Sequence, residues 1–466
     1  MTDKKNKNIE VQAGKPIYGG KTLSQYNGKT VMLERALPGE KVMAFIKKKK
    51  KGYIEAIASE ILEKSPHRTE SECKYYPTCG GCKLRDVEYD YQRWIKEEVV
   101  KDCITRIGKV KDYEFLPIVK ADNSSHYRNK MEFTFSEERY YMSKDEGFDN
   151  DKFSLGFHAP KFYSKVIDVE YCYHQPELLN YVYKSLRQIL KSSGLKPYNL
   201  LKHTGFLRYL VMRITTENKV MINLVTKSKE LDIIGSVADQ LMENHPEIVS
   251  FMNTINSRLS STAYGEETLL IKGQEVLLDY IGEYKFEISS NSFFQVNPGQ
   301  TEKLYDKIVE FAELKGEENV LDLYCGVGTI AIYINKQVKS VTGFELVEAA
   351  VVNAQRNAEL NDITNCKFVS GDLMQLAKDG EIFKEKFDII ITDPPRDGMH
   401  PKVVHSIINS EVKKIVYVSC NPSTFARDVQ LFEMGGYKLE KVQPVDMFPH
   451  TYHVETVGVL IKKQLL

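Results

Sequence analysis

Residues 319–329 read NVLDLYCGVGT, and this stretch decides the fold. An apolar run that contains Asp322 leads into Gly326 and Gly328, and a helical pattern follows. A strand, a glycine turn and a helix open the nucleotide-type α/β sheets, in which glycines let the backbone approach a ligand. A generic tight turn can carry the same glycines, so the surrounding pattern has to distinguish the two.

The alternation of strand and helix continues over residues 286–466. Strand-like apolar runs occupy 319–324, 340–345, 366–370, 387–392 and 414–419, and helical patterns occupy 300–312 and 347–359. Continuous apolar strands separated by helices indicate a parallel sheet that is covered on both faces. We therefore expect a Rossmann-like, doubly wound α/β domain at the C-terminus.

Acidic residues mark the ends of the first three strands. Glu345 ends the second strand about 20 residues beyond the glycines, where an acid binds ribose hydroxyls in nucleotide-type sites. Asp322 and Asp372 mark the first and third strands. Each acid alone fits a helix N-cap, but together they favour an adenosine-containing ligand. Phosphoryl and hydride transfer are disfavoured, because no lysine follows the glycine turn and the dinucleotide fingerprint is incomplete.

The fourth and fifth strands end in Asp393-Pro394-Pro395-Arg396 and Ser419-Cys420-Asn421-Pro422. A cysteine in a sheet is usually a small buried hydrophobic residue, and prolines after a strand merely end it. Cys420, however, lies at a strand end between polar neighbours, and reactive thiols occupy partly exposed positions of this kind. We interpret Cys420 as a nucleophile.

The N-terminal segment differs from the rest in charge and in pattern. Residues 1–60 hold thirteen basic and six acidic side chains, with five consecutive lysines at 47–51, whereas the whole chain is neutral. Short β segments at 30–34, 40–46 and 54–62 predict a small OB-like barrel of five short strands. The basic charge favours a polyanionic partner, while a solvated loop or a protein-docking module fits the same pattern.

The middle of the chain, about 125–285, mixes strand-like runs with a helical run at 178–190, which indicates an α+β domain. Basic and aromatic residues alternate at 126–130 and 203–209. This alternation suits stacking on unpaired RNA bases and pairing with phosphates, although sheet faces use the same residues structurally.

Three of the eight cysteines lie within ten residues, at Cys73, Cys79 and Cys82, and Cys172 is the natural fourth member of the group. Clustered cysteines most often bind structural zinc. The gap of five residues and the paired glycines match neither zinc-ribbon nor ferredoxin spacing. Spacing alone therefore leaves zinc and an iron–sulfur cluster open.

Four short motifs occur together in the order of a known family. They are Gln295-Val296-Asn297, Asp393-Pro394-Pro395-Arg396, Cys420-Asn421-Pro422 and His453-Val454-Glu455. From Gly14 to Val459 the chain resembles the RNA uridine-5-methyltransferase family. Within that family it is similar to the 23S rRNA (uracil-5-)-methyltransferase branch, which has an N-terminal TRAM domain and a 4Fe-4S cluster. The resemblance implies methylation of carbon 5 of a uridine in 23S rRNA by S-adenosyl-L-methionine, through a covalent cysteine–uracil adduct.

The resemblance also implies residue roles and domains. Cys420 would be the nucleophile and Glu455 the base that removes the proton from carbon 5. Gln295, Tyr324, Glu345 and Asp393 would bind the cofactor, Phe293 matches a stacking aromatic, and Cys73, Cys79, Cys82 and Cys172 match cluster ligands. The implied domains are a TRAM-like, RNA-binding barrel at 1–66, a central domain with the cluster cysteines at 67–285, and the methyltransferase domain at 286–466.

Several alternatives compete with this interpretation. A chain that resembled the cytosine-5 RNA methyltransferases would have a cysteine at the position of Arg396. A non-catalytic RNA-binding iron–sulfur protein would have no use for Cys420 and Glu455. Transfer RNA is the main alternative substrate, because relatives without the barrel and the cluster resemble tRNA uridine methyltransferases.

The sequence shows no secretory signal and no apolar run of membrane-spanning length, so we expect a cytoplasmic protein that binds RNA and no membrane, without an obligate protein partner.

Overall fold

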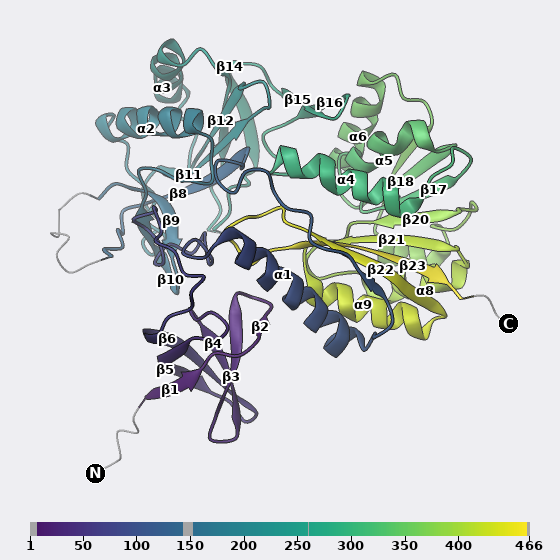
Figure 1. Ribbon diagram of the computed structural model, residues 1–466. Helices are drawn as coiled ribbons and strands as arrows, with labels where there is room; N and C mark the ends of the chain where they lie inside the picture. The colour runs from purple at the N-terminus through teal and green to yellow at the C-terminus, as the bar shows by residue number, and fades with distance from the viewer. Residues whose placement is uncertain (1–6, 143–151, 260, 464–466) are drawn as a thin grey trace.

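The stretch quoted above forms the middle of an eight-stranded sheet in the C-terminal half of the computed structural model (Figure 1). The structure describes residues 7–142, 152–259 and 261–463. In order across the sheet, the strands are β19 (Cys366–Ser370), β18 (Ser340–Glu345), β17 (Asn319–Leu323), β20 (Ile389–Thr392), β21 (Lys414–Ser419), β23 (Glu455–Lys462), β22 (Tyr437–Val445) and β7 (Glu114–Phe115). The first five are parallel to one another, and β23 runs antiparallel to β21 and β22.

Helices cover both faces of this sheet, as the apolar strands predicted. One face packs on α4 (Pro298–Ala312), α5 (Thr329–Ile334) and α6 (Glu348–Leu360). The other packs on α1 (Tyr89–Cys103), α7 (Leu373–Asp379), α8 (Pro401–Ser410) and α9 (Pro422–Met434). Successive strand residues alternate between the two cores, so that Val320 belongs to the first and Leu321 to the second. The predicted doubly wound α/β class is confirmed.

A second sheet of seven strands forms the central part of the chain. Its order is β10 (Phe162–Asp168), β9 (Ser154–Ala159), β8 (Lys130–Ser136), β11 (Leu207–Ile214), β12 (Val220–Thr226), β13 (Ile248–Ile255) and β14 (Glu267–Gly273). The helices α2 (Glu177–Ser192) and α3 (Leu231–Asn244) pack on it through apolar residues at helical spacing. This mixture of strands and helices is the α+β arrangement expected from the sequence.

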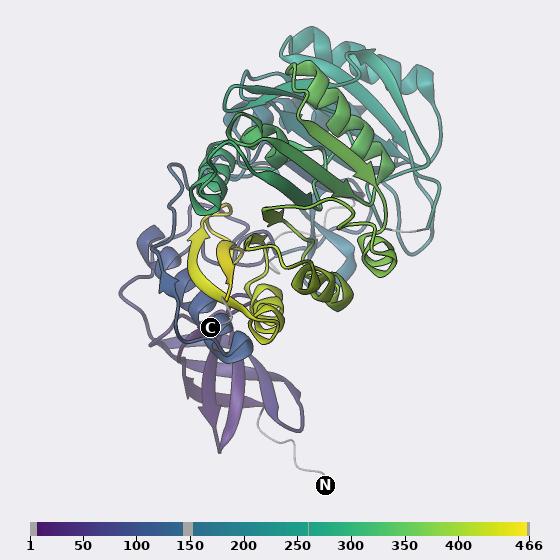
Figure 2. The ribbon, with the colours of Figure 1, turned by 90° about the vertical axis from the view of Figure 1, so that its right-hand side faces the viewer.

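The N-terminal residues form a barrel-like, six-stranded sheet, seen below the rest of the chain in Figure 2. Its order is β1 (Asn8–Gln12), β5 (Lys41–Lys49), β6 (Tyr53–Glu63), β4 (Lys29–Glu34), β3 (Lys21–Tyr26) and β2 (Pro16–Ile17). Five strands were expected, and six are present. The sequence pattern is weak for β2, because a strand of two residues has no room for alternation.

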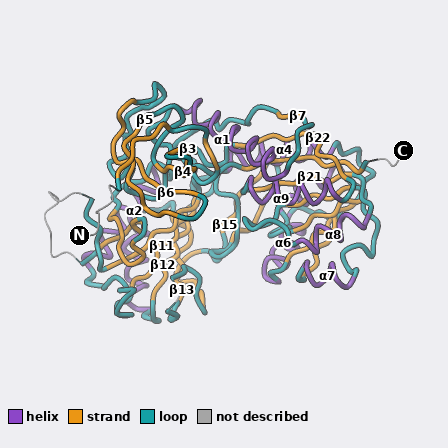
Figure 3. The backbone as a smooth tube through the Cα atoms, turned by 90° about the horizontal axis from the view of Figure 1, so that it is seen from below, coloured by secondary structure: helices purple, strands orange, loops and turns teal. Residues whose placement is uncertain are grey.

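The connections between the sheets bear on the site. The strands β15 (Leu277–Ile281) and β16 (Tyr284–Ile288) form a separate pair that leads from the central sheet into α4. A single π-helical turn, η1 (Ile104–Gly108), extends α1. Figure 3 shows α1 and β7 beside the strands of the C-terminal sheet, although both precede the central sheet in the chain. The domain limits near residues 66 and 285 stay a prediction.

None of the described helices is long and apolar enough to cross a membrane.

Candidate active site

The order of the strands predicts where a ligand binds. The chain leaves β17 toward β18 on one side, and it later returns to β20 on the other side of β17. A crevice opens at such a reversal, outside the carboxyl ends of the parallel strands. Tyr324, Asp393 and Cys420 follow these ends, and Glu345 is the last residue of its strand. Glu455 joins them because β23 is antiparallel, so that its first residue lies at the same edge.

The glycine turn after β17 is held by Glu345. One carboxylate oxygen of Glu345 accepts a hydrogen bond from the backbone N–H of Gly326 at 3.1 Å, and the other accepts one from Val347 at 2.9 Å. Gly328 has a φ of +80°, and a Cβ added there would lie 2.8 Å from the Phe368 ring. Only glycine fits at this position, because the turn packs closely on Phe368 of β19 and Ala354 of α6.

Tyr324 was expected at the end of a strand that continues to residue 324, but β17 ends at Leu323. Tyr324 has a φ of +66°, the left-handed region, which turns the chain sharply out of the sheet. Asp372, the third of the expected acids, caps α7 by accepting a hydrogen bond from the N–H of Met374 at 2.8 Å. Its observed contact is therefore that of an N-cap.

The segment before α4 lies between the central sheet and the loop that leads into Glu455, because the amide of Asn297 donates a hydrogen bond to the backbone carbonyl of Met447 at 3.0 Å. Gln295 is buried, and its backbone carbonyl accepts a hydrogen bond from the amide of Asn129 at 3.1 Å. Phe293, two residues earlier, is 71% exposed. A large apolar ring left so open is available for stacking on a planar ligand.

Two carboxyl groups and a thiol share one electrostatic environment at the strand ends. Burial and the neighbouring Asp393 raise the pKa of Glu455 to about 8, and burial raises the pKa of Asp393 to about 6. Burial, Glu455 and Asp393 together raise the pKa of the Cys420 thiol to about 12. The guanidinium of Arg396 partly offsets the effect on Glu455 and Cys420. A positive charge added to this site would therefore lower the pKa of all three groups and favour their ionised forms.

Asn421 and Pro422 have a local structural role next to Cys420. The side chain of Asn421 caps α9 by accepting a hydrogen bond from the N–H of Ser423 at 3.0 Å, and Pro422 is the first helical residue. The amide of Asn421 also donates to the backbone carbonyl of Arg396 at 2.9 Å. The cap therefore ties the segment after β20 to the segment that carries the thiol.

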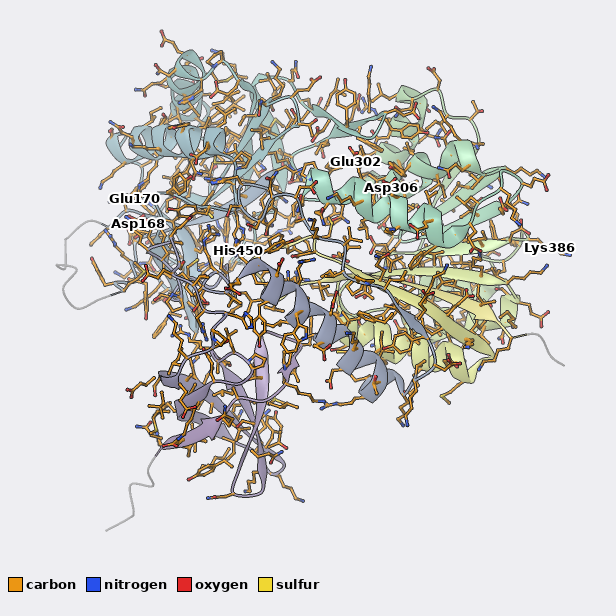
Figure 4. All side chains as sticks on the ribbon, viewed as in Figure 1. Asp168, Glu170, Glu302, Asp306, Lys386 and His450 are labelled. Atoms are coloured by element: carbon orange, nitrogen blue, oxygen red, sulfur yellow. The ribbon has the colours of Figure 1, made fainter. Side chains whose placement is uncertain are left out.

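The loop 446–453, which leads into Glu455, is held by a buried ion pair. Lys96 of α1 lies 2.6 Å from a carboxylate oxygen of Asp446 and donates to the carbonyl of Phe448 at 2.9 Å, and both charged side chains are buried. Gln92, one turn earlier, accepts from the N–H of His450 at 2.8 Å. His450 lies beside the first half of α1 in Figure 4.

This network was not predicted from the sequence. A signal was present, because Lys96 interrupts the buried stripe of α1 at helical spacing from Val99, Val100 and Cys103. A charged residue on an apolar helix face needs a buried partner.

The four clustered cysteines line one cavity, of about 190 Å³, together with Arg85 and His174. The Sγ of Cys82 lies 2.9 Å from Nε2 of His174, and every cysteine of the chain is a free thiol. Across the ranges that the structure describes, no group of three or more His, Cys, Asp or Glu side chains is arranged to hold a single metal ion.

Comparison with known proteins gives a consistent picture over nearly the whole chain. The tRNA (uracil-5-)-methyltransferase family matches residues 96–464. An uncharacterised RNA methyltransferase of Chlorobaculum tepidum is 39% identical, covering 92% of this chain and 91% of the relative, and one of Halalkalibacterium halodurans is 35% identical, covering 98% and 97%. The crystal structure of the Pyrococcus abyssi tRNA (uracil-54, C5)-methyltransferase, in complex with S-adenosyl-L-homocysteine, matches with a TM-score of 0.73 and 28% identity, over 97% of this chain and 99% of that one.

The fold, the glycine turn and these relatives define an S-adenosylmethionine-dependent RNA methyltransferase. More narrowly, the chain belongs to the family of RNA (uracil-5-)-methyltransferases, as the motifs had suggested.

Proposed function

We propose that the chain methylates carbon 5 of a uridine in 23S rRNA, with Cys420 as a covalent nucleophile and Glu455 as the base. The observation that carries the proposal is the shared environment of Cys420, Glu455 and Asp393 at one edge of the sheet. We propose that Tyr324, Glu345, Gln295 and Asp393 bind the cofactor, and support comes from the position of Tyr324, Glu345 and Asp393 at the strand ends of the same sheet edge.

The chemistry of the uracil ring requires a thiol of this kind. Carbon 5 is a weak nucleophile, and it becomes reactive when a sulfur adds to carbon 6 and the ring electrons move to an enolate. Cys420 supplies that sulfur as the thiolate, after its proton has passed to solvent water. S-adenosylmethionine, when bound, supplies the methyl group to carbon 5. The carboxylate of Glu455 then takes the proton from carbon 5, and the electron pair of that C–H bond restores the ring double bond as Cys420 leaves as a thiolate.

The charges of the site predict that ionisation of Cys420 and Glu455 is coupled to cofactor binding. Without ligand, the pKa of Glu455 is about 8 and that of Cys420 about 12, so both groups hold their protons at neutral pH. The sulfonium of S-adenosylmethionine carries a positive charge. Placed at the crevice, such a charge lowers the pKa of the nearby thiol and carboxyl groups. The thiol therefore becomes a nucleophile chiefly in the presence of the methyl donor.

The variant Glu455→Gln tests the two roles together. It keeps the shape of the side chain but cannot take the proton, so methylated RNA should remain attached to Cys420 as an adduct that survives a denaturing gel. The double variant Glu455→Gln with Cys420→Ser should give no adduct. A Glu455→Gln protein that releases methylated RNA at the wild-type rate would remove Glu455 from the mechanism.

The choice between 23S rRNA and tRNA is the finer part of the proposal. The combination of barrel and cysteine cluster supports 23S rRNA by analogy with the branch that the motifs resemble. Transfer RNA is the second candidate, because the Pyrococcus abyssi enzyme, which acts on tRNA, matches 97% of this chain. Methyl transfer from labelled S-adenosylmethionine to unmodified 23S rRNA and tRNA transcripts distinguishes them. Stoichiometric labelling of tRNA alone would overturn the 23S assignment.

We further propose that Cys73, Cys79, Cys82 and Cys172 hold a 4Fe-4S cluster, within a central domain at 67–285 that follows an RNA-binding, TRAM-like barrel at 1–66. Support comes from the common cavity of the four thiols. When bound, the cluster would cross-link two segments of that domain. About four irons and four sulfides per chain in anaerobically purified protein would agree with this, and one zinc per chain would contradict it. A cytoplasmic location is part of the same proposal.

A further inference from the structure

The turn between β2 and β3 of the N-terminal sheet reaches the C-terminal domain near Cys420. The Tyr18 ring on this turn meets the Tyr452 ring edge-on, with 5.8 Å between centroids. It also packs against the cluster formed by Val99, Cys103 and Ala426, from α1 and α9. Lys15, before the turn, forms an ion pair with Asp102 of α1. The turn is thus docked on the elements that flank the thiol.

The surroundings of Tyr18 belong to the proposed catalytic site. Tyr452 stacks on His453 with 4.1 Å between ring centroids, and Glu455 follows two residues later. Cys103, which packs on Tyr18, has its Sγ 3.6 Å from the hydroxyl of Ser423, in the first turn of α9. That helix begins at Pro422, two residues after Cys420. Two independent segments therefore connect the Tyr18 ring to the thiol and to the base.

The hydroxyl of Tyr18 is left without a protein partner. The side chain is half-buried, and no hydrogen bond joins its hydroxyl to any residue within the described parts of the chain. Burial, Tyr452 and Cys420 raise the pKa of this phenol to about 12, so it stays protonated and can donate a hydrogen bond. A tyrosine hydroxyl that no residue engages is free to donate to a ligand, and the carbonyl and phosphate oxygens of RNA are acceptors.

We propose that Tyr18 is a substrate-positioning residue, supplied by the N-terminal sheet, whose phenol donates a hydrogen bond to the target nucleotide when that nucleotide reaches Cys420. The proposal rests on the proposed role of Cys420. Under this proposal the N-terminal sheet contributes a residue that contacts the target nucleotide, in addition to binding RNA away from the active site. A target base has to leave its stack to enter a buried site, and a donor at the entrance helps to hold it there.

The variants Tyr18→Phe and Tyr26→Phe separate this role from simple packing. Tyr18→Phe keeps the ring that contacts Tyr452 and removes only the hydroxyl. Tyr26 lies on β3 of the same sheet and packs on the core of that sheet, so Tyr26→Phe is the matched control. The probes are 23S rRNA and tRNA transcripts that contain 5-fluorouridine, with saturating S-adenosylmethionine. The measurements are the single-turnover rate of adduct formation at saturating RNA and the melting temperature.

Tyr18→Phe should form the adduct about 2- to 10-fold more slowly, the effect of one neutral hydrogen bond, with an unchanged melting temperature. Tyr26→Phe should react at the wild-type rate. If Tyr18→Phe reacts at the wild-type rate while the wild-type adduct forms normally, only the inference on Tyr18 is overturned. If the wild-type protein forms no adduct with either transcript, the proposed nucleophile fails, and the role of Tyr18 fails with it.

Discussion

Replacing Glu455 by glutamine should stabilise the protein, and by an amount that grows with pH. The pKa of Glu455 is raised from an ordinary 4.5 to about 8 by burial and by Asp393. A carboxyl group whose folded pKa is raised contributes its full stability below the unfolded pKa, and that contribution is lost as pH rises toward the folded pKa. Glu455 ionises at a lower pH in the unfolded chain than in the folded one. At 1.36 kcal/mol per pKa unit, this difference lowers the free energy of unfolding by about 3 kcal/mol at pH 7 and about 5 kcal/mol at pH 9.

Thermal melts of the protein without cofactor or RNA, at pH 5, 7 and 9, test this. One kcal/mol shifts the melting temperature of a domain of this size by about 2–4 °C. Glu455→Gln should therefore melt close to the wild type at pH 5 and about 6–12 °C higher at pH 7. Glu440 lies exposed on β22 of the same sheet, so Glu440→Gln is the matched control and should show no such trend. A difference between Glu455→Gln and wild type that does not change with pH would refute a raised pKa at Glu455.

Three further predictions follow from the site. Lys96→Met leaves Asp446 buried without its partner, and chemical denaturation should show a loss of about 3–5 kcal/mol, most of it recovered when Asp446→Leu is added. Gly328→Ala places a Cβ against the Phe368 ring and should abolish binding of S-adenosylhomocysteine in calorimetry. Gly316 has a φ of +93° but open space around it, so the control Gly316→Ala should lower stability and leave binding unchanged. Arg396→Ala removes the positive charge that lowers the pKa of the strand-end thiol, so adduct formation should need a higher pH, and an unshifted pH–rate profile would contradict this.

The sequence predicted the C-terminal sheet well because its signals are local and repeated. Each parallel strand is a short apolar run, and four of the five end in a polar residue, namely Glu345, Ser370, Thr392 and Ser419. Three of the expected strands, including 340–345 and 414–419, have the bounds that the structure shows. The topology rule for doubly wound sheets then brings their ends together.

Long-range contacts could not be predicted in the same way. The pairing of Lys96 with Asp446 joins residues 350 positions apart. The apolar stripe around Lys96 indicates that it needs a buried partner, but nothing local identifies Asp446 as that partner. The docking of Tyr18 on Tyr452 joins the two ends of the chain. A two-residue strand such as β2 has no periodicity to detect, and the left-handed backbone of Tyr324 is a property that side-chain pattern does not encode.

The most direct test of the central claim is a covalent trap. Fluorine at carbon 5 cannot leave as a proton, so RNA that contains 5-fluorouridine should stall on Cys420 after methyl transfer. Wild-type protein and the control variant Cys366→Ala, which removes a buried cysteine of the same sheet, should each give a shifted band on a denaturing gel that requires S-adenosylmethionine. Cys420→Ser should give none. A wild-type protein that methylates ordinary RNA but forms no band with the fluorinated transcript, or a band that persists in Cys420→Ser, would contradict the account.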